Sequence, residues 1–176
     1  MKKIMFNDKY GLTQAVLDGR KTMTRRVVTQ NSMTDILCGY SRYQVGEVVA
    51  IAQSYRDVYL NSGSIYKIGL LGRTAGWRNK MYVSAGDMPH HIKITNIRVE
   101  HLQDISDEDC LREGVYMDYD EHGGLYTTPY YDYPNNKHNG FDSPREAFAA
   151  LIDKVSGKGI WDSNPMVWVY EFELVD

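Results

Sequence analysis

The chain has 176 residues, a net charge of −3, 43% hydrophobic and 24% charged residues, a composition that excludes a disordered or fibrous protein. No apolar run reaches the length that crosses a membrane. Two widely spaced cysteines and no apolar leader segment predict a cytoplasmic protein with reduced thiols.

Apolar and β-branched runs predict the elements of the first half of the chain. A short strand at 4–7 precedes a helix at 9–18, which Asp8 begins and Gly19 ends. Strands are expected at 22–28 and 47–54, with a polar loop at 30–44 between them. Four glycines and no periodicity indicate irregular structure at 55–79.

The strand expected at 91–100 changes its phase. Ile92 and Ile94 share one face, whereas Ile97 and Val99 share the other. A bulge near residues 95–96 would place all four on one core.

Two helices and a last strand follow. Ser106 begins a short helix that ends at Gly114, and Ser143 begins a longer one that ends at Gly157. Between them, residues 115–141 are rich in Tyr and Asp, without clear structure, which is typical of a functional or mobile segment. Strict alternation at 166–174 predicts a half-buried strand.

Strands in clusters with short helices between them favour an α+β fold. We expect a small mixed β-barrel with short flanking helices rather than a doubly wound sheet. With no repeat and no linker, residues 1–176 should form a single domain, and the Tyr-rich segment at about 115–141 reads as an insertion.

The segment GRKTMTRR at 19–26 concentrates four cations and two hydroxyls at a helix-to-strand junction. Such a density of like charge suits an anionic or polar partner. A solvated basic turn explains the pattern equally well.

The same segment resembles the signature of the ASCH domain, a member of the PUA-like superfamily, with Gly19, Lys21, Thr24 and Arg26 at its four places. The resemblance extends to uncharacterised, prophage-type ASCH-like proteins through GEVV at 46–49, RVEHLQDI at 98–105, EGV at 113–115 and WDSNPMVWVYEF at 161–172. It implies a PUA-like barrel. The stretch YVSAGDMPHH at 82–91 departs from those relatives, so specificity should differ there.

Bacterial ASCH enzymes that hydrolyse N4-acetylcytidine are more distant relatives. This resemblance implies Lys21, Thr24 and Glu113 as catalytic residues. Thr24 would act as the nucleophile or position a water, Lys21 would serve as base or oxyanion partner, and Glu113 would protonate the leaving amine, with Arg26 orienting substrate.

Two physical points bear on these roles. Glu113 ends a helix, where the dipole and Asp109 one turn earlier both disfavour its charge, although an exposed helix-end residue fits the sequence somewhat better. Lys21 and Thr24 are three residues apart, so they meet only if Lys21 lies on the turn before the strand.

The rival function is an RNA- or DNA-binding module without catalysis. The partner is therefore a nucleoside or a nucleic acid, and the oligomeric state stays open. The residues expected to contact phosphates or stack bases are Arg20, Lys21, Arg25, Arg26, Tyr55, Tyr59, Trp77 and Tyr82.

No cofactor and no metal are expected. Cys38, Cys110, His122, His138 and the other histidines lack zinc-ligand spacing, and no glycine loop fits a phosphate-binding motif.

Overall fold

The structure is a computed structural model that describes residues 1–28, 34, 39–62, 74–119, 125–128 and 140–175. Cys38, His122 and His138 lie outside the described residues. Within them, no helix has the length and apolar character that a membrane span requires.

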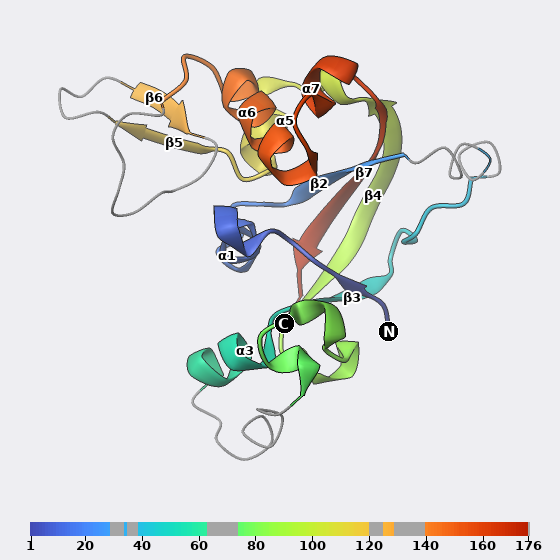
Figure 1. Cartoon of the computed structure of the whole chain (residues 1–176). Coiled ribbons are helices and arrows are strands. Elements are labelled where there is room, and N and C mark those ends of the chain that lie inside the picture. Colours follow the sequence, from blue (N-terminus) through green and yellow to red (C-terminus); the bar gives the residue numbers. More distant parts are fainter. Residues whose placement is uncertain (29–33, 35–38, 63–73, 120–124, 129–139, 176) are drawn as a thin grey trace.

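A five-stranded mixed sheet, strongly curved, forms the centre of the molecule (Figure 1). β1 runs parallel to β3, and all other neighbours are antiparallel. The longest ladder joins β4 and β7. In spatial order the strands are β1 (Lys3–Ile4), β3 (Val48–Ile51), β4 (His91–His101), β7 (Met166–Leu174) and β2 (Met23–Val27).

The sheet is open, so the fold is α+β but the expected barrel is not confirmed. Edge strands β1 and β2 share no ladder in the described part of the chain. β1 offers only two residues for further pairing. A side chain spans the opening instead, since Arg26 Nη2 donates to the Met5 carbonyl at 2.6 Å.

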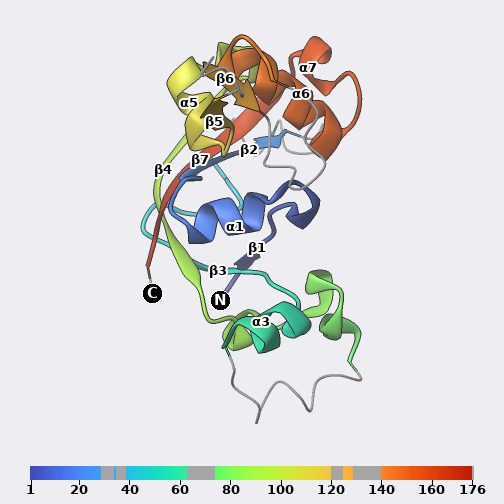
Figure 2. The same cartoon turned by 90° about the vertical axis from the view of Figure 1, so that its left-hand side faces the viewer.

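Helices gather at the two ends of the sheet (Figures 1 and 2). α5, α6 and α7 lie at one end, α3 lies at the other, and α1 crosses the concave side between them. The helices of the described residues are α1 (Leu12–Leu17), α3 (Tyr55–Ser62), α5 (Asp107–Arg112), α6 (Pro144–Ser156) and α7 (Ile160–Ser163).

Two hydrophobic clusters follow this arrangement. The larger cluster joins α1, α6 and the sheet through side chains such as Val16, Phe148 and Ile94. The smaller one packs α3 beneath β3, where Tyr55 and Val58 meet Ala52. The larger cluster supplies the walls of the site described below.

Several predicted signals are confirmed. Ser106 and Ser143 accept hydrogen bonds from the backbone N–H groups of Asp109 and Glu146 and so cap α5 and α6. The register of β4 shifts between Ile94 and residue 96, as the phase change required. Ile97 then packs against the core cluster that contains Ile92 and Ile94, but Val99, which was expected there too, is not among the side chains packed against that cluster.

Four expectations were wrong. Asn7, not Asp8, caps the first 3-10 turn (Asp8–Tyr10), because the Asn7 side chain accepts from the Lys9 N–H. Residues 55–79 include helix α3, and residues 115–141 include a hairpin of β5 (Tyr116–Tyr119) and β6 (Leu125–Thr128). α7 was not expected either. These elements are short or weakly periodic, and tertiary contacts decide such cases.

Candidate active site

Lys21 and Thr24 reach one pocket because Lys21 lies on the turn before β2. Gly19 has a left-handed φ of 73° just after α1, and the Lys21 N–H donates to the Ala15 carbonyl at 2.8 Å. The strand begins only at Met23, so strand alternation does not apply to Lys21. Both side chains are buried and line a pocket of about 260 Å³, here called the Lys21 pocket.

Glu113 caps the C-terminal end of α5 and meets Lys21 inside this pocket. Lys21 Nζ donates to the Glu113 carboxylate oxygen Oε2 at 2.6 Å and to the Glu113 carbonyl at 2.7 Å. Lys21 is 2% exposed and Glu113 is 4% exposed. Salt therefore screens this ion pair far less than a surface pair.

Burial lowers the pKa of the Lys21 amine below its usual range, and attraction to Glu113 offsets only part of that effect. A neutral amine has two N–H groups and one lone pair. Because Glu113 accepts two hydrogen bonds from Nζ, the lone pair of a neutral Lys21 stays free to take a proton. A charged Lys21 has a third N–H for an oxyanion instead.

The second carboxylate oxygen of Glu113 is held by Arg25. Arg25 Nη1 donates to Glu113 Oε1 at 3.1 Å. The guanidinium is itself fixed by Glu100 at 2.6 Å and by Asp109 at 3.0 Å, and its side chain is 1% exposed. Arg25 thus ties the Lys21 pocket to a larger ionic network.

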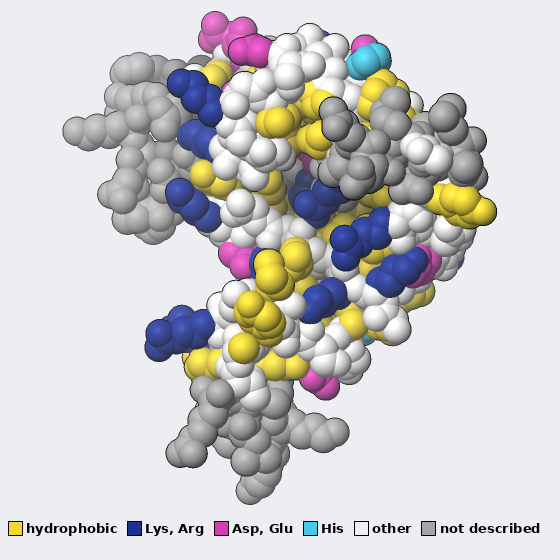
Figure 3. Space-filling model, turned by 45° about the vertical axis from the view of Figure 1, so that its right-hand side comes forward, with side chains coloured by type: hydrophobic (Ala, Val, Ile, Leu, Met, Phe, Trp, Pro, Cys, Tyr) yellow, Lys and Arg dark blue, Asp and Glu magenta, His cyan; other side chains and the backbone are white. Residues whose placement is uncertain are grey.

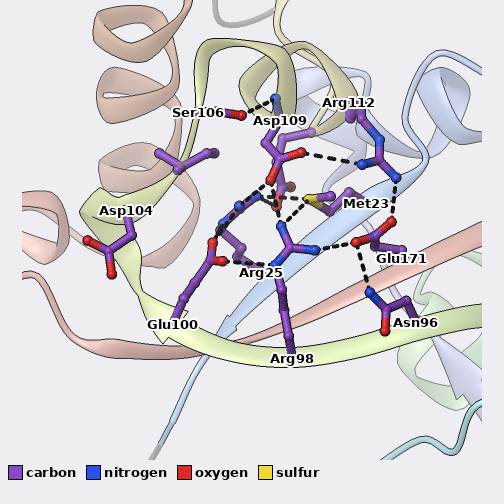
Figure 4. A network of polar contacts seen from close by, with 12 residues as sticks. Met23, Arg25, Asn96, Arg98, Glu100, Asp104, Ser106, Asp109, Arg112 and Glu171 are labelled. Carbon is purple, nitrogen blue, oxygen red and sulfur yellow. Dashed lines mark hydrogen bonds and ion pairs between the residues drawn. The ribbon is translucent and has the colours of Figure 1, made fainter.

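Figure 4 shows this network, in which arginines alternate with carboxylates. Arg98 bridges Asp109 at 2.6 Å and Glu100 at 2.9 Å, and it also pairs with Glu171. Arg112 joins Glu171 at 2.8 Å and Asp109 at 3.3 Å. The Asp109 carboxylate, which we expected to repel Glu113, therefore lies among three guanidiniums.

Apolar side chains complete the Lys21 pocket. Phe6 lies with its ring centroid 5.9 Å from Lys21 Nζ, and Leu12, Phe148 and Leu151 line the walls. Such surroundings suit a planar, weakly polar ligand group rather than an ion.

Two hydroxyl side chains line the pocket, the buried Thr24 and the exposed Ser156. In the described part of the chain, the hydrogen bonds of Lys21 Nζ go to Glu113 and none goes to Thr24. A proton would pass between them only after a ligand or a water closes the distance. Cys110 is a poor rival nucleophile, because the buried thiol has a pKa raised to about 12.

Of the other expected binding residues, Arg25 and Arg26 line the Lys21 pocket and the rest lie elsewhere. Arg20 is exposed and pairs with Asp18 at 3.2 Å, whereas Arg26 lies at the rim of the Lys21 pocket. The aromatic residues lie near α3, at the other end of the sheet: Tyr55 is buried and donates to Asp87, Trp77 packs against Tyr59, and Tyr82 is exposed.

A second pocket, of about 470 Å³, lies on the other side of Arg26 and was missed by the sequence reasoning. Its signal was a pair of tyrosines flanking Ser41 and Arg42 at 40–43, within a stretch interpreted as a loop. We call it the Arg42 pocket. Its lining residues are Lys3, Ile4, Met5, Arg26, Val27, Tyr40, Ser41, Arg42, Tyr43, Trp168 and Tyr170.

No group of three or more His, Cys, Asp or Glu side chains in the described ranges is arranged to hold a metal ion. The carboxylates nearest the Lys21 pocket are already engaged by Lys21, Arg25, Arg98 and Arg112.

Comparison with known proteins finds no matching family model and no similar curated protein. Two solved structures resemble this chain at low identity. The hypothetical protein PH0355 matches 99% of this chain and 100% of its own, at 10% identity and a TM-score of 0.44. An ASCH domain from Lactobacillus crispatus matches 93% of this chain and 69% of its own, at 11% identity and a TM-score of 0.40. Neither likeness assigns a function.

Proposed function

We propose that this protein hydrolyses the amide bond of an acylated nucleoside, with N4-acetylcytidine as the test substrate, in the Lys21 pocket. The observation that carries the proposal is the meeting of Lys21, Thr24 and Glu113 in one pocket of about 260 Å³. A hydroxyl, an amine of lowered pKa and a carboxylate can supply the nucleophile, the base and the acid of amide hydrolysis.

The first half of the reaction forms an ester. The Thr24 hydroxyl attacks the amide carbonyl carbon as neutral Lys21 takes its proton. The C–N bond of the tetrahedral intermediate then breaks. The proton passes from the Lys21–Glu113 pair to the leaving nitrogen, so that the free exocyclic amine departs.

The second half regenerates the hydroxyl. A water molecule attacks the ester carbonyl, Lys21 takes the proton from that water, and the Thr24 oxygen leaves and is reprotonated. The net change is one amide and one water converted to one amine and one carboxylic acid. If Thr24 positions the water instead, the proton transfers are the same without the ester.

Arg25 supports this chemistry by fixing the Glu113 carboxylate. It holds Glu113 Oε1 at 3.1 Å while Lys21 uses Oε2, so the carboxylate cannot rotate freely. An oriented carboxylate keeps one N–H group of Lys21 directed toward Glu113 Oε2, while the Glu113 carbonyl holds a second. We therefore assign Arg25 as a positioning residue.

Nucleic-acid binding without catalysis is the second candidate function. The observation that favours it is the Arg42 pocket, which gathers cationic and aromatic side chains. A pure binding module would tolerate the loss of the Thr24 hydroxyl, whereas an amidohydrolase would not.

The test is the release of cytidine from N4-acetylcytidine by the wild type and by Lys21→Ala, Thr24→Ala and Glu113→Ala. We expect turnover by the wild type and a loss of about a hundredfold or more in each variant. Thr22→Ala is the matched control, since Thr22 lies in the same segment but does not line the Lys21 pocket. No turnover by the wild type at high enzyme concentration would reject this substrate.

A further inference from the structure

We propose that the Arg42 pocket binds the phosphate of a nucleotide whose base occupies the Lys21 pocket. The substrate is then a phosphate-bearing nucleotide, free or within a strand, rather than a free nucleoside. The identity of the base rests on the proposed function, but the phosphate site rests on observations of its own.

The charge of the Arg42 pocket is the first of these observations. Three cations line it, Lys3, Arg26 and Arg42, and the described residues that line it include no carboxylate. The whole chain carries a net charge of −3, so this local excess is not a reflection of overall composition. A pocket of uncompensated cations attracts a di- or monoanion.

Two of the cations are held in place without being neutralised. Lys3 Nζ donates to the carbonyls of Met81 at 2.7 Å and Val83 at 2.6 Å. Arg26 Nη2 donates to the Met5 carbonyl at 2.6 Å. Carbonyl partners fix the side chains and leave their full positive charge for a ligand.

Arg42 completes the cationic side of the pocket. It is exposed, and its guanidinium lies 5.7 Å from the ring centroid of Tyr43. A guanidinium has the N–H geometry for bidentate contact with a phosphate.

Four aromatic side chains also line the pocket. Trp168 stacks on Tyr170 at 6.4 Å, and Tyr43 meets the Tyr170 ring edge-on at 5.1 Å. Tyr40 lies at the pocket with 68% of its surface exposed. Rings beside cations are the combination that binds nucleotides through their sugar, phosphate and neighbouring bases.

The two pockets adjoin. Arg26 and Val27 line both of them, with the Lys21 pocket toward α6 and the Arg42 pocket toward β1 and β7. The Arg42 pocket thus occupies the opening between the unpaired edges β1 and β2. Figure 3 shows Lys and Arg side chains running along a hollowed face of the molecule, with hydrophobic side chains between them. One ligand can therefore place its base on one side of Arg26 and its phosphate on the other.

Titration calorimetry with cytidine 5′-monophosphate and with cytidine tests the proposal. We expect the monophosphate to bind the wild type about tenfold tighter than the nucleoside, since one charge-assisted contact accounts for that factor. Arg42→Ala should abolish this difference and leave cytidine binding unchanged, and Arg42→Lys should restore part of it. Lys93→Ala, which removes an exposed cation outside both pockets, should change neither affinity.

Equal affinities for cytidine and its monophosphate would overturn the proposal, as would a monophosphate affinity that survives Arg42→Ala. A single-stranded pentanucleotide that binds tighter than the monophosphate assigns the phosphate to a strand, and equal binding assigns it to a free nucleotide. Either result supports the site. The calorimetry measures binding and not hydrolysis, so the two proposals can fail separately. An Arg42-dependent gain in affinity for the monophosphate without hydrolysis would reject the proposed function alone. Hydrolysis without that gain in affinity would reject the phosphate site alone.

Discussion

Replacing Glu113 with Gln removes one charge from the centre of the site without changing its size. The carboxylate accepts from Lys21 Nζ at 2.6 Å and from Arg25 Nη1 at 3.1 Å. An amide offers one oxygen and one NH2 group, so in either orientation one buried cation meets a donor. Breaking a buried ion pair from one side costs about 3–5 kcal/mol.

The surroundings place the expected cost near the low end of that range. Lys21 keeps the Glu113 backbone carbonyl at 2.7 Å, and Arg25 keeps Glu100 and Asp109. We therefore predict that Glu113→Gln lowers the free energy of unfolding by about 3 kcal/mol. With a urea slope of about 2 kcal/mol per molar, the denaturation midpoint falls by about 1.5 M.

A double-mutant cycle with Lys21→Met isolates the pair. Because Met removes the cation that Gln leaves unpaired, the double variant should be more stable than the sum of the two single losses by about 2 kcal/mol. Lys2→Ala is the control, since its pair with Glu47 has the same chemistry at 3.0 Å but lies at the surface, and its loss should cost less than about 1 kcal/mol. Additive losses in the cycle, or a Glu113→Gln cost like that of Lys2→Ala, would refute the reasoning.

Three further predictions follow from the same geometry. Burial lowers the pKa of Lys21, so the fraction of neutral amine increases as pH rises, and kcat/KM for amide hydrolysis should increase with pH at values below the usual lysine pKa of about 10.4. Lys21→Arg should abolish this pH dependence. A wild-type kcat/KM that does not change with pH contradicts a base role for Lys21. Gly114 has a φ of 99°, at which an alanine is strained. Gly114→Ala should therefore lower the free energy of unfolding by about 1–2 kcal/mol and the melting temperature by about 4 °C in a thermal scan. An unchanged melting temperature would contradict backbone strain at this position. Tyr55→Phe removes the hydroxyl that accepts from the Ser84 N–H and donates to Asp87. Calorimetry should find the nucleotide affinity unchanged, and urea titration should find the free energy of unfolding lower by about 1–2 kcal/mol. Weaker nucleotide binding would instead assign Tyr55 to the ligand site.

Local signals explain which elements the sequence predicted. Ser106 and Ser143 cap α5 and α6, and each side-chain oxygen accepts from a backbone N–H of the first turn. Such a contact depends only on residues close in sequence. The alternation over β7 and the phase change in β4 are equally local. α3 was missed because its buried residues, Tyr55 and Val58, pack in a separate cluster and are too few to set a helical period.

The residues of the site also divide into those that a local pattern predicted and those that depend on distant segments. Lys21 and Thr24 were predicted from a motif, and Gly19 showed where the turn that unites them had to lie. The resemblance placed Lys21 and Glu113 in one site, but the ion pairs of Glu113 were not predictable from local pattern, because Arg25 and Lys21 reach it across 88 and 92 residues of sequence. The Arg42 pocket depends on β1, β2 and β7 together with residues 40–43, and no sequence pattern states that these segments meet.

The most direct test of the central claim is the rate of acetate release from N4-acetylcytidine by two isosteric variants, Thr24→Val and Thr22→Val. Both remove one hydroxyl from neighbouring positions, but only Thr24 lines the Lys21 pocket. We predict that Thr22→Val keeps the wild-type rate within about threefold while Thr24→Val loses about a hundredfold or more. Equal rates for the two variants would contradict catalysis by the Thr24 hydroxyl at this site.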